Sequence, residues 1–199
     1  MGTPEFRTAA LGYRVDSAAV LNSGVPNSYD AYNGYEYAFD AEKAKAELTE
    51  AGYDFSQTFR ICYYNNDQTS IDLISTVAYY LEQTGMKVET TLSNDGTTDL
   101  FTTRDYDIGF KGKSAFSIDE WYTEYLSTDA LFGATNEADR NAALKELQEL
   151  EQEKVYKVPV FTLGNYVFLS NHVVVPESVE FCNPLYSCDV DFANWELAK

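Results

Sequence analysis

The chain alternates between strand-like and helix-like segments over residues 58–92, and this alternation constrains the fold more than any other feature. Residues 58–64 (Thr-Phe-Arg-Ile-Cys-Tyr-Tyr) have the β-branched and aromatic content of a strand. Residues 86–92 alternate as a second strand does. Between them, residues 69–72 (Thr-Ser-Ile-Asp) have the spacing of a capping box, and Gly85 ends the helix that follows. Strand, helix and strand with short joints predict a βαβ unit with parallel strands.

Further segments extend this pattern to an α/β fold. Residues 106–110 (Tyr-Asp-Ile-Gly-Phe) are typical of a third strand. Asp40 is placed to cap a helix that Gly52 ends, and Asn136 is placed to cap another. The sequence therefore predicts a mixed, mainly parallel sheet flanked by helices. Its strands lie near Thr58, Met86 and Tyr106, and the covering helices start near Asp40, Ser70 and Asn136.

The helix capped by Asp40 has Ala41, Ala44, Leu48 and Ala51 at helical spacing, and each of the other two helices carries an apolar stripe. The first stripe consists of Ile71, Ile74, Val77, Ala78 and Leu81. The second consists of Ala143, Leu144, Leu147 and Leu150. The Glu and Lys residues between the members of the second stripe are expected to form a solvated face.

The remaining expectations concern the two ends and the connections. We expect helices over residues 7–21, 99–104 and 118–127, strands over residues 158–163 and 166–170, and a loop over residues 22–37. Four tyrosines of this loop either line a ligand cleft or pack the loop onto the domain. They are Tyr29, Tyr32, Tyr35 and Tyr37.

The charge and length of the chain exclude several classes of function. Its 199 residues suffice for one large domain with a sizeable core. The formal net charge of −18 repels nucleic acid and anionic lipid. No apolar run is long enough for a membrane helix, and residues 1–6 lack the features of a signal peptide. Residues 1–6 are expected to be a remnant of an expression vector; the alternative is that residues 4–7 are native.

The three cysteines allow at most one disulfide within the chain, and the sequence does not decide whether it forms. Cys62 lies in an apolar strand and is expected to pack as a small hydrophobic residue. Cys182 and Cys188 flank a turn-rich stretch that could bring their sulfurs together. The alternatives are a disulfide, which fits an oxidising compartment, and two unpaired thiols. No His or third Cys is near them in sequence, so a zinc site is not expected.

The sequence gives little support to catalysis. His172 is the one histidine, and it has no designated partner for a triad or a multi-histidine metal site. Asp105 and Asp107 share one strand face, which indicates a solvated edge more than a catalytic dyad. Residues 94–96 (Asn-Asp-Gly) form a turn without the ligand pattern of a calcium loop. No phosphate-cradling glycine loop follows a strand. We therefore expect no catalytic residue, no metal and no cofactor.

Four stretches of the chain, in order, resemble one protein family. Residues 42–53 read Glu-Lys-Ala-Lys-x-x-Leu-x-x-Ala-Gly-Tyr, and residues 81–88 read Leu-Glu-Gln-Thr-Gly-Met-Lys-Val. The shorter matches are Tyr-Asp-Ile at residues 106–108 and Val-Pro-Val at residues 158–160. This set resembles the extracytoplasmic solute-binding proteins, family 5, of peptide-type (oligopeptide, dipeptide or nickel) ABC importers.

The resemblance implies the C-terminal ligand-binding lobe of a two-lobed protein, with the type II fold of periplasmic binding proteins. It implies that residues 7–170 form this lobe and that residues 171–199 are a tail returning toward a first lobe that the chain lacks. In such proteins two lobes close on the ligand about a hinge.

The resemblance also implies a role in transport. The parent protein would capture a small solute, peptide-like or other, and deliver it to ABC permease subunits, from the periplasm or the outer face of the bacterial membrane. The resemblance also allows a lipid anchor on the parent protein. We expect no nucleic-acid partner and no membrane span in this chain. The residues leave two alternatives open: an extracellular interaction module with the tyrosine-rich loop as its contact face, and an enzyme on a similar fold, against which the missing nucleophile–base set counts.

The candidate binding residues follow the predicted strands at their carboxyl ends, where open α/β sheets bind ligands. Those after the third strand either form a ligand site or an ordinary basic loop, and Trp121 and its neighbour Tyr122 either wall the cleft or pack in the core. The candidates are Tyr64, Asn65, Asn66, Lys111, Gly112, Lys113, Ser114, Phe116 and Trp121.

One departure from the resemblance bears on the ligand. In peptide-binding relatives the loop after the third strand carries an aromatic residue and then an aspartate that pairs with the free amino group of the peptide. The approximate counterparts here are Lys113 and Phe116. The sequence therefore does not favour recognition of a peptide amino terminus.

Overall fold

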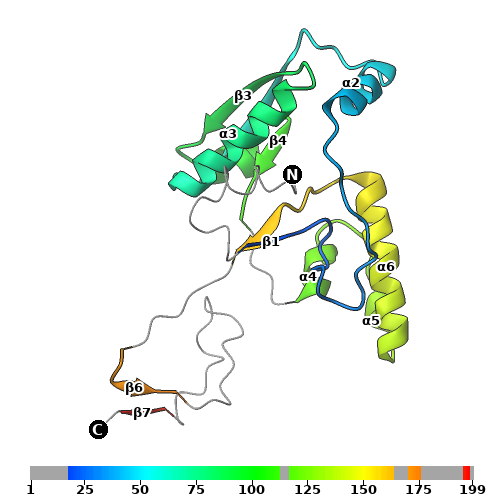
Figure 1. The fold of residues 1–199 in the computed structure, drawn as a ribbon, viewed down its shortest axis with the longest axis vertical. Coiled ribbons are helices and arrows are strands. Elements are labelled where there is room, and N and C mark those ends of the chain that lie inside the picture. The colour runs from blue at the N-terminus through cyan, green and yellow to red at the C-terminus, as the bar shows by residue number, and fades with distance from the viewer. Residues whose placement is uncertain (1–17, 113–116, 164–169, 176–194, 198–199) are drawn as a thin grey trace. The chain divides into compact units, whose positions relative to one another are not determined.

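The computed structural model describes residues 18–112, 117–163, 170–175 and 195–197, and the chain divides into two compact units (Figure 1). The first unit is Met1–Thr162 and the second is Leu163–Lys199. The first unit contains a parallel sheet and a helical core.

Three parallel strands form the sheet, in the order β3-β2-β4. The central strand β2 (Thr58–Tyr63) pairs with β3 (Lys87–Leu92) on one side and with β4 (Ile108–Phe110) on the other. The helix α3 (Gln68–Glu82) connects β2 to β3. The predicted βαβ unit and the parallel direction of all three strands are confirmed.

The helix α3 covers one face of the sheet (Figure 1). Ile74 packs with Ile61 and Tyr63 of β2 in a buried cluster. Partly buried side chains surround this cluster: Phe59, Ile71, Val77, Leu81, Val88 and Phe110. The predicted stripe of α3 therefore faces the sheet.

The start of α3 differs from the expected capping box at residues 69–72. The N-cap residue is Asp67, whose carboxylate accepts hydrogen bonds from the backbone N–H of Ser70 at 3.1 Å and from its hydroxyl at 2.7 Å. Because Asp67 satisfies the free donors of the first turn, the helix begins two residues earlier than the box predicts. At the other end, Gly85 has φ +93°, as expected for the residue that ends the helix.

The helix α2 (Ala41–Glu50) has the predicted caps but not the predicted packing. The Asp40 carboxylate accepts from the backbone N–H of Lys43 at 2.9 Å, and Gly52 has φ +75°. None of the α2 residues is buried. The sequence therefore predicts the caps of α2 correctly, because they depend on neighbouring residues. The prediction that α2 covers the sheet is not confirmed.

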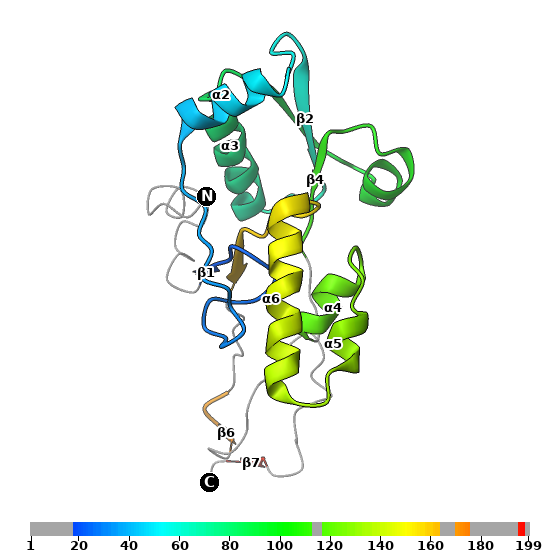
Figure 2. The ribbon, with the colours of Figure 1, turned by 90° about the vertical axis from the view of Figure 1, so that its right-hand side faces the viewer.

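A second core forms around α6 (Glu137–Lys154), with α4 (Ile118–Thr123) and α5 (Asp129–Gly133) beside it (Figure 2). Asn136 caps α6 as predicted, accepting from the backbone N–H of Asp139 at 2.9 Å. The expected helix over residues 118–127 ends at Thr123. The core residues are Val25, Ala31, Tyr122, Leu131, Ala143, Leu144 and Leu147. Ala143, Leu144 and Leu147 of the predicted stripe therefore pack here rather than on the three-stranded sheet, which corrects the predicted arrangement. Leu150, the fourth member of that stripe, is 39% exposed, so its predicted inward position is wrong.

The expected helix over residues 7–21 is wrong at its C-terminal end. Residues 18–20 form β1 (Ala18–Val20), which pairs with β5 (Phe161–Leu163), and the N–H of Leu21 donates to the carbonyl of Val160 at 3.1 Å. A partner strand far away in sequence overrides the local helical pattern. Residues 7–17 lie outside the described residues. The strand expected over residues 158–163 is confirmed only for its last three.

The remaining elements are short. The helix expected over residues 99–104 is the π-helix η2 (Thr97–Thr103). In the second unit, β6 (Val173–Val174) pairs antiparallel with β7 (Glu196–Leu197). The strand expected over residues 166–170 lies outside the described residues except for Ser170. Within the described ranges no helix is long and apolar enough to cross a bilayer.

Candidate functional site

The candidate site is the carboxyl edge of the three-stranded sheet. Tyr63 at the end of β2 lies opposite both Leu92 of β3 and Phe110 of β4. The residues that directly follow all three strands therefore meet at one edge. Open parallel sheets bind their ligands at this edge, and the sequence placed its candidate residues here.

Two of the three predicted residues after β2 have a distinctive setting. Tyr64 is 40% exposed, and its side chain lies against Gly96, where a Cβ atom would come within 2.7 Å of the tyrosine Cβ and Cγ. A side chain at position 96 would thus displace the Tyr64 ring. The Oδ1 atom of Asn65 is buried and accepts no hydrogen bond within the described part of the chain. Asn66 is exposed.

The predicted residues after β4 that the structure describes are Lys111 and Gly112, and both are exposed. The Lys111 ammonium lies 5.7 Å from the centroid of the half-exposed Phe101 ring, which the sequence did not single out. No ion pair to Lys111 is seen among the described residues. A Cβ atom at Gly112 would meet no atom within 4 Å, so the backbone is open to approach there. The predicted residues Lys113, Ser114 and Phe116 lie outside the described residues.

Two carboxylates at this edge are already engaged by the chain. Asp95 accepts hydrogen bonds from the backbone N–H and the hydroxyl of Thr98, and these lower the pKa of its carboxyl. Asp99 accepts from the hydroxyl of Ser93 at 2.6 Å. The turn expected at residues 94–96 therefore leads directly into η2, and Asp95 bonds to Thr98 in its first turn.

Trp121 lies in the helical core. Its indole N–H donates to the Glu151 carboxylate at 2.8 Å, and a Cβ atom at Gly24 would overlap its ring, at 1.9 Å. Tyr122 beside it is fully buried. Of the two roles that the sequence left open, Tyr122 has the core role; Trp121 packs on the same core.

Glu151 organises this core, and the sequence missed it. Glu151 is 2% exposed, and its carboxylate accepts four hydrogen bonds. The donors are the Trp121 indole, the hydroxyls of Tyr122 and Tyr125, and the backbone N–H of Gly24. Burial raises the pKa of the Tyr122 and Tyr125 hydroxyls, and the negative charge of Glu151 raises it further.

Gln148 supports the same core one turn earlier on α6. It is fully buried; its amide oxygen accepts from the Ser23 hydroxyl at 3.0 Å, and its amide nitrogen donates to the Ala31 carbonyl at 2.7 Å. The Glu and Lys residues between the members of the stripe, Lys145, Glu146 and Glu149, are exposed, which confirms the expected solvated face. Neither Gln148 nor Glu151 was assigned from the sequence. The signal was their position, because Leu144, Gln148 and Glu151 follow one another at helical spacing.

One cation lies over this aromatic group. The Lys157 ammonium is 4.2 Å from the centroid of the Tyr125 ring and 4.8 Å from that of Trp121, and it pairs with Glu124. A cation in such a position is attracted electrostatically to the ring face.

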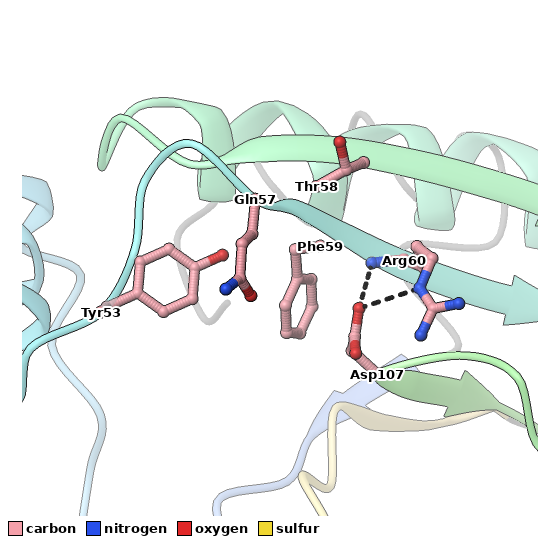
Figure 3. Close-up of a pocket in the computed structure, with 6 residues that line it drawn as sticks. All are labelled: Tyr53, Gln57, Thr58, Phe59, Arg60 and Asp107. Atoms are coloured by element: carbon pink, nitrogen blue, oxygen red, sulfur yellow. Dashed lines mark hydrogen bonds and ion pairs between the residues drawn. The ribbon is translucent and has the colours of Figure 1, made fainter.

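A separate open pocket of about 470 Å³ lies at the opposite, amino edge of the sheet (Figure 3). The Asp107 carboxylate accepts from the backbone N–H of Arg60 at 2.8 Å and from its Nε at 3.4 Å, and both donors lower the pKa of Asp107. Arg60 also pairs with Asp105. The two aspartates thus share a cation on an exposed edge rather than forming a dyad. The other lining residues are Tyr53, Gln57, Thr58 and Phe59.

The cysteines, the histidine and the possible metal ligands were also candidates for chemistry, and the described residues among them show no reactive or metal-binding arrangement. Cys62 is a free, buried thiol, as predicted, and burial together with the nearby Asp99 charge raises its pKa. Cys182 and Cys188 lie outside the described residues. His172 is exposed, and its backbone N–H donates to the Ser170 hydroxyl. Where the structure describes the chain, no group of three His, Cys, Asp or Glu side chains is placed to hold a metal ion.

Comparison with solved structures identifies the fold. The chain resembles the ABC transporter substrate-binding protein CtaP from Listeria monocytogenes, with a TM-score of 0.61, 18% identity, and coverage of 80% of this chain and 38% of that one. It resembles AgaA from A. tumefaciens R10 in complex with agropinic acid, with a TM-score of 0.63, 18% identity, and coverage of 79% and 38%. It also resembles NikA from Brucella suis in complex with Fe(III)-EDTA, with a TM-score of 0.61, 15% identity, and coverage of 79% and 39%.

These likenesses show the type II fold of periplasmic binding proteins, as the sequence predicted. The chain spans less than half of the length of each of the three structures. No curated protein sequence gave a significant match.

A family comparison extends over more than half of the chain. Residues 6–142 match the profile of the bacterial extracellular solute-binding proteins, family 5 Middle. This range includes the three-stranded sheet, α3 and the edge at which β2 and β4 end. The chain belongs to the bacterial extracellular solute-binding proteins of family 5.

Proposed function

We propose that this chain is one lobe of an extracytoplasmic solute-binding protein that captures a small ligand and delivers it, chemically unchanged, to an ABC permease. The observation that carries the proposal is the register of the sheet. Because Tyr63 lies opposite Phe110, Tyr64 and Asn65 are brought next to Lys111 and Gly112 at one edge. That edge offers a ring, an amide, a cation and an open stretch of backbone.

The charges at this edge favour a ligand with an acidic group. Lys111 has no acidic partner among the described residues, while Asp95 and Asp99 already accept hydrogen bonds from Thr98 and Ser93. A ligand carboxylate would pair with the free ammonium, and charge-assisted hydrogen bonds of this kind are among the strong ones. The rings of Tyr64 and Phe101 would favour an apolar or ring-bearing part beside it.

The same argument disfavours an ordinary peptide held by its amino terminus. A buried ammonium group needs a carboxylate partner, because leaving it unpaired costs several kcal/mol. Phe116 stands near the position where peptide-binding relatives have an aspartate, and it supplies no carboxylate. Lys111 and Lys113, which precede Phe116 in the sequence, would repel a ligand ammonium group.

Binding by this chain alone is expected to be weak. We assign residues 7–170 to the lobe and residues 171–199 to a tail that returns toward a first lobe. Half of the surface that encloses the ligand, and so half of the desolvation, belongs to that other lobe. The parent protein would act outside the cytoplasm, in the periplasm or at the outer face of the membrane.

A thermal-shift screen on the full-length parent protein tests the proposal, because a true ligand stabilises the folded state by mass action. The panel contains peptides, sugars, opine-type acids and metal chelates, each with a neutral analogue that lacks the carboxylate. We expect one acidic compound to raise the melting temperature in a concentration-dependent way and its neutral analogue to have less effect. Stabilisation by none of the panel, or by free-amine peptides alone, would contradict the proposal.

A further inference from the structure

Five aromatic side chains of the first unit form two groups, one on segment 35–37 and one that joins Phe39 to the end of α3. Phe39 meets Tyr80 with ring centroids 4.8 Å apart, and Tyr79 lies 5.6 Å from Tyr80. Tyr35 and Tyr37 form a second pair at 4.8 Å. The chain segment 35–39 joins the two groups. We call these five residues the aromatic strip.

Four of the five rings are exposed and Tyr80 is partly buried, although the protein buries aromatic rings elsewhere. Tyr79 is 58% exposed, Phe39 45%, Tyr35 44% and Tyr37 41%. In contrast, Tyr122 is fully buried and Tyr63 nearly so. Large apolar side chains that gather on a surface, rather than standing singly, mark sites of interaction.

The segments that carry the strip have only negative charge. Residues 29–42 and residues 68–82 contain no Lys, Arg or His. Glu36 stands between Tyr35 and Tyr37, Asp40 follows Phe39, and Glu82 follows Tyr79 within one helical turn; all three are exposed. The nearest cation along the chain, Lys43, pairs with Glu47 on α2. The strip thus consists of two groups of rings on segments whose charged residues are all acidic.

The strip lies away from the candidate ligand site. The helix α3 has 15 residues, which gives it a length of about 22 Å. Its first turn follows Tyr64 and Asn65 at the carboxyl edge, whereas Tyr79 and Tyr80 belong to its last turn. A partner on the strip would therefore not need to enter the ligand edge.

We propose that the aromatic strip docks an arginine-rich segment of a protein partner. A guanidinium group stacks on a ring face while it donates to a nearby carboxylate, so exposed rings on acidic segments match arginine in both respects. Lysine fits less well, because its ammonium is more strongly hydrated and lacks a flat face. A second copy of this chain is disfavoured by its charge of −18, and an anionic lipid surface is disfavoured by the same field.

The test is the binding of a fluorescein-labelled peptide of alternating arginine and glycine to this chain, followed by fluorescence anisotropy at physiological ionic strength. The variant is Tyr79→Ala, and the matched control is Phe132→Ala, which removes a ring that is 65% exposed on α5. Neither substitution changes the net charge. Tyr79→Ala should weaken binding about two- to fivefold, and Phe39→Ala with Tyr79→Ala about tenfold, while Phe132→Ala leaves it unchanged.

A second comparison distinguishes the effect of a carboxylate near the strip from the effect of the net negative charge of the chain. Glu82→Gln and Glu149→Gln each remove one exposed negative charge, the first beside the strip and the second on α6. Glu82→Gln alone should weaken binding, and a lysine–glycine peptide should bind more weakly than the arginine peptide. Equal effects of Tyr79→Ala and Phe132→Ala, or of the two glutamate variants, would show that bulk charge alone attracts the peptide and would overturn the proposal. Self-association of the chain that Tyr79→Ala abolishes would also overturn it, in favour of a second copy.

Discussion

The indole N–H of Trp121 donates to the carboxylate of Glu151 at 2.8 Å, inside a core that contains no cation bonded to that carboxylate among the described residues. The negative charge is instead satisfied by four donors from α4, its following turn and the loop at Gly24. A buried charge that loses such donors is costly, because its desolvation is no longer offset. This arrangement ties α4 and the N-terminal loop to α6.

Replacing Glu151 by glutamine should therefore destabilise the protein by about 2–4 kcal/mol. The amide keeps the shape of the side chain but leaves donors that now lack acceptors. Urea unfolding followed by tryptophan emission measures the change. Glu149→Gln on the exposed face of the same helix is the control and should change stability by less than about 0.5 kcal/mol. Equal stability of the two variants would show that Glu151 does not hold this core together.

The cap of α6 gives a smaller, separable effect. Asn136→Ala removes the acceptor of the Asp139 backbone N–H and should lower the free energy of unfolding by about 1 kcal/mol. Glu146→Ala, at an exposed position within α6, should lower it by less than about 0.5 kcal/mol. Both values come from the same urea titrations. A loss at Asn136 no greater than that at Glu146 would contradict the cap.

Acid should remove the stabilisation that Asp107 provides. The backbone N–H of Arg60, and then its guanidinium, hold the pKa of Asp107 below its usual range. This stabilisation is present above the unfolded pKa of about 4 and is lost as pH falls through the lower folded value. Unfolding measured at neutral pH and at about pH 3 should therefore show a smaller acid loss for Asp107→Asn than for the unmodified protein.

Arg60→Gln is the companion variant for this pH dependence. It keeps the backbone N–H, which is the larger cause of the lowered pKa, and should reduce the acid loss less than Asp107→Asn does. If Asp107→Asn leaves the acid loss unchanged, the hydrogen bonds of Asp107 do not contribute to stability in the folded protein.

Thiol labelling tests both the buried cysteine and the disulfide that stays a prediction. Cys62 is buried and the pKa of its thiol is raised by burial, so it should not react in the native protein. In the unfolded, non-reduced protein, intact mass should show a single labelled cysteine if Cys182 and Cys188 are bonded to each other. Labelling of all three cysteines under these conditions would refute the disulfide.

The sequence predicted the parts of the fold that depend on local pattern. The stripe that starts at Ile71, the caps at Asp40 and Asn136 and the left-handed Gly52 and Gly85 arise from residues close together in the chain, and all are found. It failed where distant segments decide. The strand β1 depends on β5, which lies far along the chain, so local helical spacing was misleading there.

The candidate site was predictable to the same degree. Parallel strands place their carboxyl ends together, so the sequence was sufficient to assign Tyr64 and Lys111 to one edge of the sheet. The Phe101 ring beneath Lys111 could not be, because the π-helix that carries it has no distinct sequence signal. The buried setting of Gln148 and Glu151 was not predicted, because acids and amides on a helix usually face solvent.

Calorimetry on the full-length parent protein tests the central claim most directly. The acidic ligand found by thermal shift is titrated into the unmodified protein, Lys111→Ala, Lys113→Ala, Phe116→Asp, and the control Lys145→Ala, whose lysine is exposed on α6. Lys111→Ala should weaken binding about tenfold to a hundredfold by removing a charge-assisted hydrogen bond, and Lys145→Ala should not change it. Tight binding of a free-amine peptide that is undiminished in Lys111→Ala, Lys113→Ala and Phe116→Asp would contradict the placement of the site at the carboxyl edge of the sheet.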